Sequence, residues 1–154
     1  MEPLRTYEIP LLHPLVVHFP IAMVLVGTVA VLIWVSKPSA FWYRCATLAF
    51  LVGALAATAA YFTGEAAEEA AENVPIVDEI VGLHERMAIF TLAATLITLL
   101  ALVLTQPRLL SGSTDEPPPA KGVRFAIGAL AITAAILVAF TSHLGGLMVW
   151  GVPR

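Results

Sequence analysis

The chain is poor in cysteine and in charge, and both shortages limit what it can be. One of its 154 residues is cysteine, Cys45, so an internal disulfide and a C-x-x-C-H haem-attachment motif are excluded. Charged residues make up 12% of the sequence, against about a quarter in ordinary soluble domains. The small net charge of −3 argues against nucleic-acid binding. Any haem in such a protein is held without covalent attachment.

What the chain has instead is hydrophobic length. Hydrophobic residues form 59% of the sequence, and the mean hydropathy is +0.89. Four stretches reach the roughly 20 apolar residues that a helix needs to cross a bilayer, and none alternates like a barrel strand. They cover residues 14–35, 40–62, 80–105 and 123–150. The sequence therefore predicts an all-α integral membrane four-helix bundle, with residues 1–154 forming a single domain.

The ends of these spans carry the usual helix signals. We expect Pro14 in the first turn of a helix, where its missing N–H costs nothing, and Ser39 as an N-cap. Gly64 is expected to end the second span. Residues 106–121 form a polar linker rich in proline and serine. The first ten residues have no basic segment before an apolar core, so we expect no cleaved signal peptide.

Basic residues predict which way the spans face. Five lie toward one side: Lys37, Arg44, Arg108, Lys121 and Arg124. The other side carries Arg5, Arg86 and Arg154, together with nine of the eleven acidic residues. Because cytoplasmic loops are enriched in lysine and arginine, both termini are predicted in the periplasm and the protein in a bacterial inner membrane. Aromatic belts are expected at the cytoplasmic interface (Trp34, Trp42 and Tyr43) and at the outer one (Tyr7, Tyr61 and Trp150).

All four histidines fall at the periplasmic ends of the spans. His13 and His18 open the first span, His84 opens the third, and His143 closes the fourth. Ionisable groups at membrane depth are costly and usually functional. Counting about 20 residues from the cytoplasmic interface puts His18, His84 and His143 in nearly one plane, with His13 about a turn above.

Small and weakly polar residues predict the faces that pack inward. On the third span these are His84, Ala88, Thr91, Thr95, Thr98 and Leu102. On the fourth span they are Gly128, Ala131, Ala135, Ala139 and His143, followed by Gly145 and Gly146. Ordinary helix packing also produces such stripes, but inward histidines beside small residues leave room for a flat cofactor.

Three motifs resemble a widespread bacterial membrane family classed as a domain of unknown function. They are HPLVVHFPIA from His13 to Ala22, HE at His84-Glu85, and HLGG from His143 to Gly146. The resemblance spans essentially the whole chain. Some relatives are fused to Rieske iron–sulfur or cytochrome c domains, which implies membrane electron transfer and a haem cofactor.

Three functions fit these residues. The first is electron transfer through one or two b-type haems, with His18, His84 and His143 as preferred iron ligands, His13 as a further candidate and Arg86 facing a propionate. The second is a Cu, Zn or Fe ion held by His18, His84 and His143, assisted by Glu85. The third is a structural subunit without a cofactor. No hydrolase or NTPase motif is present, and no residue argues for a reductase.

An acidic loop suggests a partner for the first function. Residues 65–79 contain six acidic residues and no basic one. Such a run is usually a solvated surface, but complementary charge also speeds encounter with a basic protein. A periplasmic cytochrome c or Rieske-type protein is the expected redox partner, beside membrane lipid and a second copy of the chain.

Overall fold

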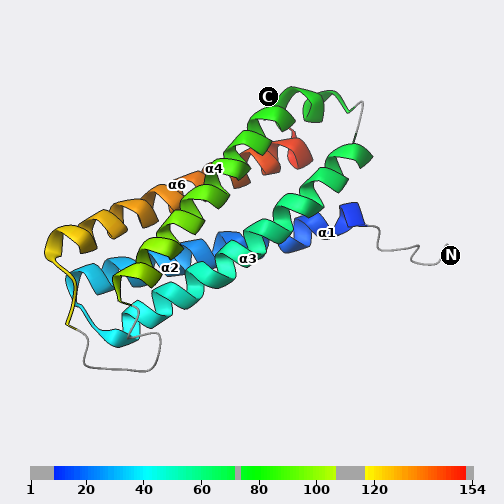
Figure 1. Ribbon diagram of the computed structural model, residues 1–154. Coiled ribbons are helices and arrows are strands. Elements are labelled where there is room, and N and C mark those ends of the chain that lie inside the picture. The colour runs from blue at the N-terminus through cyan, green and yellow to red at the C-terminus, as the bar shows by residue number, and fades with distance from the viewer. Residues whose placement is uncertain (1–8, 72–73, 107–116, 152–154) are drawn as a thin grey trace.

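The computed structural model describes residues 9–71, 74–106 and 117–151, with side chains described from residue 12 onward. Its helices are α1 (Ile9–Val16), α2 (His18–Ser36), α3 (Ala40–Ala70), α4 (Pro75–Thr105) and α6 (Lys121–Trp150) (Figure 1). Four helical segments are long and apolar enough to cross a membrane, taking Leu12–Ser36 as one. Each predicted span lies within one of them. The predicted all-α four-helix bundle is confirmed, and the described residues contain no strand.

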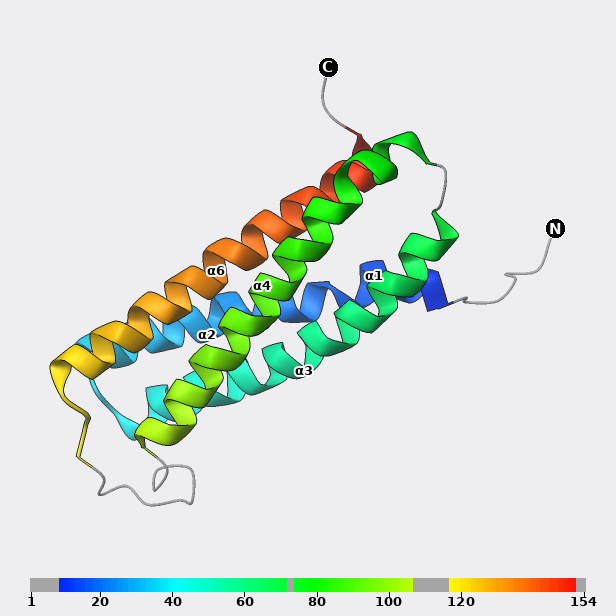
Figure 2. The same cartoon turned by 45° about the horizontal axis from the view of Figure 1, so that its top comes forward.

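The four long helices form a ring. Helix α2 packs on α3 and α6, and α4 packs on the same two helices from the other side. Helices α2 and α4 are therefore diagonal neighbours. Helix α1 continues the course of α2 and packs mainly on α3 (Figure 2). Helix α1, the end of α3, the start of α4 and the end of α6 all lie at one end of the bundle (Figure 1).

Two helix boundaries differ from the sequence prediction. Pro14 lies inside α1 rather than in its first turn, and the helix is interrupted at Val17. Pro20 explains the interruption, because it lacks the N–H that would bond to the carbonyl of Val16, and its ring crowds that carbonyl. Gly64 does not end a helix. The alanine- and glutamate-rich residues that follow it favour helix strongly, and α3 continues to Ala70.

The best-packed region lies at the end where α2 passes into α3. We call it the tryptophan end, after Trp34 and Trp42. The side chains of Trp34, Tyr43, Phe50 and Leu102 are fully buried there, and the Tyr43 hydroxyl donates to the Leu102 carbonyl. Trp34 and Tyr43 therefore belong to the core and not to an aromatic belt. Ser39 caps α3 as predicted, since its Oγ accepts the N–H of Trp42 at 3.3 Å.

Packing is looser at the opposite end, which we call the histidine end because His13 and His84 lie there. On α3 no residue from Leu55 to Ala70 is buried, and on α4 none from Pro75 to Phe90 is buried. The apolar core cluster runs through the other part of the bundle. The two ends thus differ in kind: one is filled by large side chains, and the other is lined by half-buried polar ones.

Candidate site at the histidine end

His13 is hydrogen-bonded to α3, at Thr63 and at the backbone of Ala60, and lies close to Gly64 of that helix. Its Nδ1 lies 3.1 Å from Oγ1 of Thr63. The Thr63 hydroxyl donates its own proton to the carbonyls of Ala59 and Ala60, so it accepts from the Nδ1–H of His13. A Cβ on Gly64 would stand 3.2 Å from Cε1 of His13. Glycine at this position lets the imidazole lie flat against the helix backbone.

His84 is held against α6 in the same manner. Its Nδ1–H donates to the backbone carbonyl of Thr141 at 3.1 Å. A Cβ on Gly145 would stand 3.3 Å from Cε1 of His84. The sequence prediction that His84 points into the bundle is confirmed, together with the inward threonine stripe below it, of which Thr95 and Thr98 are fully buried.

The two histidines occupy equivalent places in two helical hairpins. Each lies near the start of the first helix of its hairpin and packs on a glycine near the end of the second helix. His13 lies on α1, which packs mainly on α3, and His84 lies on α4, which packs on α3 and α6, and the two imidazoles are close enough to interact electrostatically. The partner of His84 is a carbonyl, which only accepts, so Nδ1 of His84 is the donor and its neutral ring keeps the lone pair on Nε2. The His13 ring has the same arrangement in the tautomer that carries its proton on Nδ1.

His18 and His143 are exposed and do not join this pair. On α6 the buried positions include Ala131, Ala134 and Val138. His143 lies five residues beyond Val138, which turns it about 140° away from that face. The structure therefore brings together His13 and His84, whereas the sequence favoured His18, His84 and His143.

Glu85 and Arg86, the other two residues that the sequence singled out, are also exposed. The Nε of Arg86 donates to the carbonyl of Gly82 on its own helix at 3.1 Å. In the described part of the chain Glu85 accepts from neither histidine and does not pair with Arg86. It lines the surface between α3 and α4 instead.

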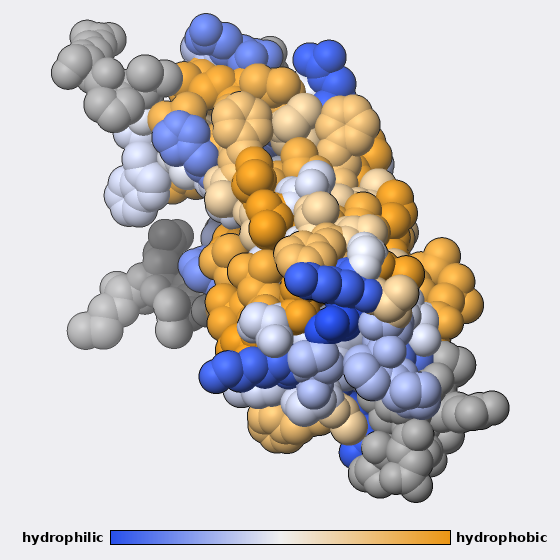
Figure 3. All heavy atoms as spheres, turned by 90° about the vertical axis from the view of Figure 1, so that its left-hand side faces the viewer, coloured by the Kyte–Doolittle hydropathy of each residue, from blue (hydrophilic) through white to orange (hydrophobic). Residues whose placement is uncertain are grey.

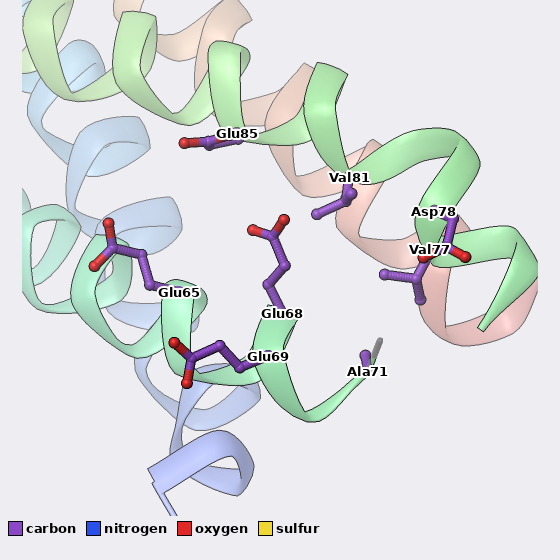
Figure 4. Close-up of a pocket in the computed structure, with 8 residues that line it drawn as sticks. All are labelled: Glu65, Glu68, Glu69, Ala71, Val77, Asp78, Val81 and Glu85. Carbon is purple, nitrogen blue, oxygen red and sulfur yellow. The ribbon is translucent and has the colours of Figure 1, made fainter. Parts of the chain in front are cut away.

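That surface is an open acidic hollow of about 410 Å³. In Figure 4, Glu68 and Glu85 reach into it from α3 and α4. Its remaining lining residues are Glu65, Glu69, Ala71, Val77, Asp78 and Val81. The hollow adjoins the histidine end, because Glu85 directly follows His84 and Glu65 follows Thr63 and Gly64.

The geometry limits which metal sites the described residues can form. Across residues 9–71, 74–106 and 117–151, no three side chains of His, Cys, Asp or Glu are placed to share one ion. A bare Zn ion usually takes three or four protein ligands. Haem iron needs only two, because the porphyrin supplies four nitrogens. The two neighbouring imidazoles of His13 and His84 match the number of protein ligands that haem iron needs.

Four residues of this arrangement escaped the sequence prediction: Thr63, Gly64, Thr141 and, as a contact of His84, Gly145. The sequence did carry a signal for the partners of His13, since Thr63 and Gly64 are adjacent at the end of the second span. On α6 the partner of His84 is a backbone carbonyl, and no sequence pattern marks a carbonyl.

The family comparison covers nearly the whole chain. Residues 9–152 match the family described as "Predicted membrane protein (DUF2231)", and the chain belongs to this family of membrane proteins. No curated protein matches it, and no solved structure does.

Proposed function

We propose that this membrane protein is an electron-transfer subunit of the bacterial inner membrane that binds one b-type haem between His13 and His84. One observation carries the proposal: two half-buried imidazoles from different helices, α1 and α4, lie near each other, and each has a hydrogen-bond partner at Nδ1, which makes Nε2 the nitrogen that would bind iron. An imidazole oriented in this way by a partner at Nδ1 is the usual arrangement of a metal-ligating histidine. Bound haem would supply one-electron chemistry.

The protein's own residues would do the positioning. Thr63 and the Thr141 carbonyl fix the ring tautomers, and Gly64 and Gly145 allow each ring to approach its helix. The packing around these residues is looser than in the rest of the bundle, so a flat group costs least to admit there, because α3 after Ala54 and α4 before Thr91 have no buried side chain that must move. Arg86, on the outside of α4, is left out of this assignment.

An absorption spectrum of protein purified from cells supplied with haem tests the assignment. We expect a Soret band and, after reduction, the sharp visible bands of a six-coordinate low-spin haem. His13→Ala and His84→Ala should remove or strongly shift these bands, while His18→Ala and His143→Ala serve as matched controls and keep them. Two results would contradict the proposal. One is a wild-type protein without haem absorption, and the other is loss of the bands in both control variants but in neither test variant.

The acidic hollow supports a basic redox partner on the periplasmic side, such as a lysine-rich cytochrome c. Glu65, Glu68 and Glu85 line the hollow beside the histidine end, so charge would bring such a partner close to the haem. Electron-exchange rates measured by stopped flow should fall as salt rises, because screening shortens to about 8 Å at physiological ionic strength. Glu65→Gln/Glu68→Gln should flatten that dependence, and rates indifferent to salt would leave the hollow as solvated surface.

A further inference from the structure

The tryptophan end carries three basic side chains around one junction, where α2 ends and α6 begins. An Nη atom of Arg124 donates to the carbonyl of Val35 at 2.8 Å. Lys37 follows Val35 by two residues, and Lys121 precedes Arg124 by about one turn of α6. We call Lys37, Lys121 and Arg124 the basic corner.

The charge of the basic corner is not neutralised within the described chain. All described acidic residues lie at the histidine end: Glu65, Glu68, Glu69, Asp78, Glu79 and Glu85. No described carboxylate pairs with Lys37, Lys121 or Arg124. Nζ of Lys121 lies 5.7 Å from the centroid of the Phe125 ring, and Nε of Arg124 is buried and has no acceptor among the described residues. Because Lys37 and Lys121 are exposed, the corner presents positive charge to a ligand.

Exposed apolar side chains lie next to these cations along the membrane-crossing helices. Phe125 and Val123 are exposed on α6, and Leu32 is exposed on α2. Figure 3 looks onto this end of the bundle and shows strongly hydrophilic side chains set directly beside hydrophobic surface. In a phospholipid the charged phosphate lies at one end and the apolar acyl chains extend from it. The cations at the helix ends and the apolar side chains beside them have the same arrangement.

We infer that the basic corner binds the headgroup of an anionic phospholipid. The phosphodiester would accept from Lys37, Lys121 and Arg124, and the acyl chains would lie along the exposed apolar residues of α2 and α6. A cluster of cations just beyond a membrane span attracts anionic lipid. The binding surface is separate from the histidine pair, and the inference holds whether or not haem is bound.

Lipid titration of the full-length protein in a neutral detergent tests this inference. Phosphatidylglycerol should raise the melting temperature and remain bound in native mass spectra, and phosphatidylcholine should do so far less. Each cation removed should weaken phosphatidylglycerol binding about fivefold, so Lys37→Gln gives an intermediate and Lys37→Gln/Lys121→Gln a loss of roughly 25-fold. Both lysines are exposed, so the variants keep the fold, which circular dichroism checks.

Two controls make the test specific. Arg86→Gln removes an exposed cation from the other end and should leave phosphatidylglycerol binding unchanged. Inorganic phosphate, which has the charge without acyl chains, should not raise the melting temperature. Equal binding of both lipids, a double variant with wild-type affinity, or full stabilisation by phosphate alone would each overturn the inference.

Discussion

The two ends of the bundle are packed in different ways. At the tryptophan end, large side chains such as Trp34, Tyr43 and Phe50 close the interior completely. At the histidine end the interior is lined by half-buried polar groups, and two imidazoles are placed by hydrogen bonds instead of by tight packing. The well-packed end therefore supplies most of the buried contacts between helices, and the looser end is where we propose that haem binds.

The largest expected effect tests the tryptophan end. Phe50 is fully buried, and its ring lies where a Cβ on Gly27 of α2 would stand. Phe50→Ala should therefore lower the free energy of unfolding by about 3–5 kcal/mol, measured by thermal or denaturant unfolding, while folded protein keeps its haem spectrum. Phe62→Ala, on an exposed side of the same helix, is the matched control and should cost much less. Equal losses would remove the contrast between the ends.

The next effect distinguishes the two histidines. Thr63→Val removes the acceptor of the His13 Nδ1–H but keeps the shape of the side chain. Loss of such a partner typically costs 10–100-fold in metal affinity, and haem titration measures it. Thr141→Val is the control, because His84 donates to the backbone carbonyl of that residue and not to its hydroxyl. Thr63→Ser should restore affinity, and equal behaviour of the two valine variants would contradict the assigned hydrogen bonds.

The smallest expected effect comes from alanine substitutions at four glycines, two that contact an imidazole and two that do not. Alanine at Gly64 or Gly145 places a Cβ within 3.3 Å of an imidazole, so the ring must move by a few tenths of an ångström. Alanine at Gly82 or Gly146 meets nothing within 4 Å and gains helix propensity of up to about 1 kcal/mol. We expect a few-fold loss of haem affinity in the first pair only. Equal losses of haem affinity in all four alanine variants would show that the close contacts between glycine and imidazole do not affect haem binding.

The sequence predicted the interior of α4 correctly and that of α6 only in part, for a geometric reason. The chosen stripe on α4 runs from His84 to Leu102, which is eighteen residues or five whole turns, so it returns to the same face. The chosen stripe on α6 took three successive steps of four residues after Ala131. Each such step overshoots a turn by about 40°, and His143 therefore lies about 120° away from Ala131, on the exposed side.

Two further errors have the same origin, namely that tertiary contacts decide what a residue does. The local pattern predicts a helix stop at Gly64, but the lack of a side chain there makes room for His13. It predicts Tyr43 at the membrane interface, but the Tyr43 hydroxyl reaches the Leu102 carbonyl across the bundle. The number of helices and the inward side of α4 follow from local patterns, whereas the pairing of His13 with His84 depends on how two hairpins meet.

Rescue with free imidazole is the most direct test of the central proposal, which is that His13 and His84 both bind the iron of one haem. His13→Gly and His84→Gly each leave a space the size of the missing ring. In either variant loaded with haem, added imidazole should restore the six-coordinate low-spin spectrum, and His18→Gly and His143→Gly should have that spectrum without it. A wild-type low-spin spectrum in the double variant His13→Gly/His84→Gly, with no imidazole present, would contradict the account.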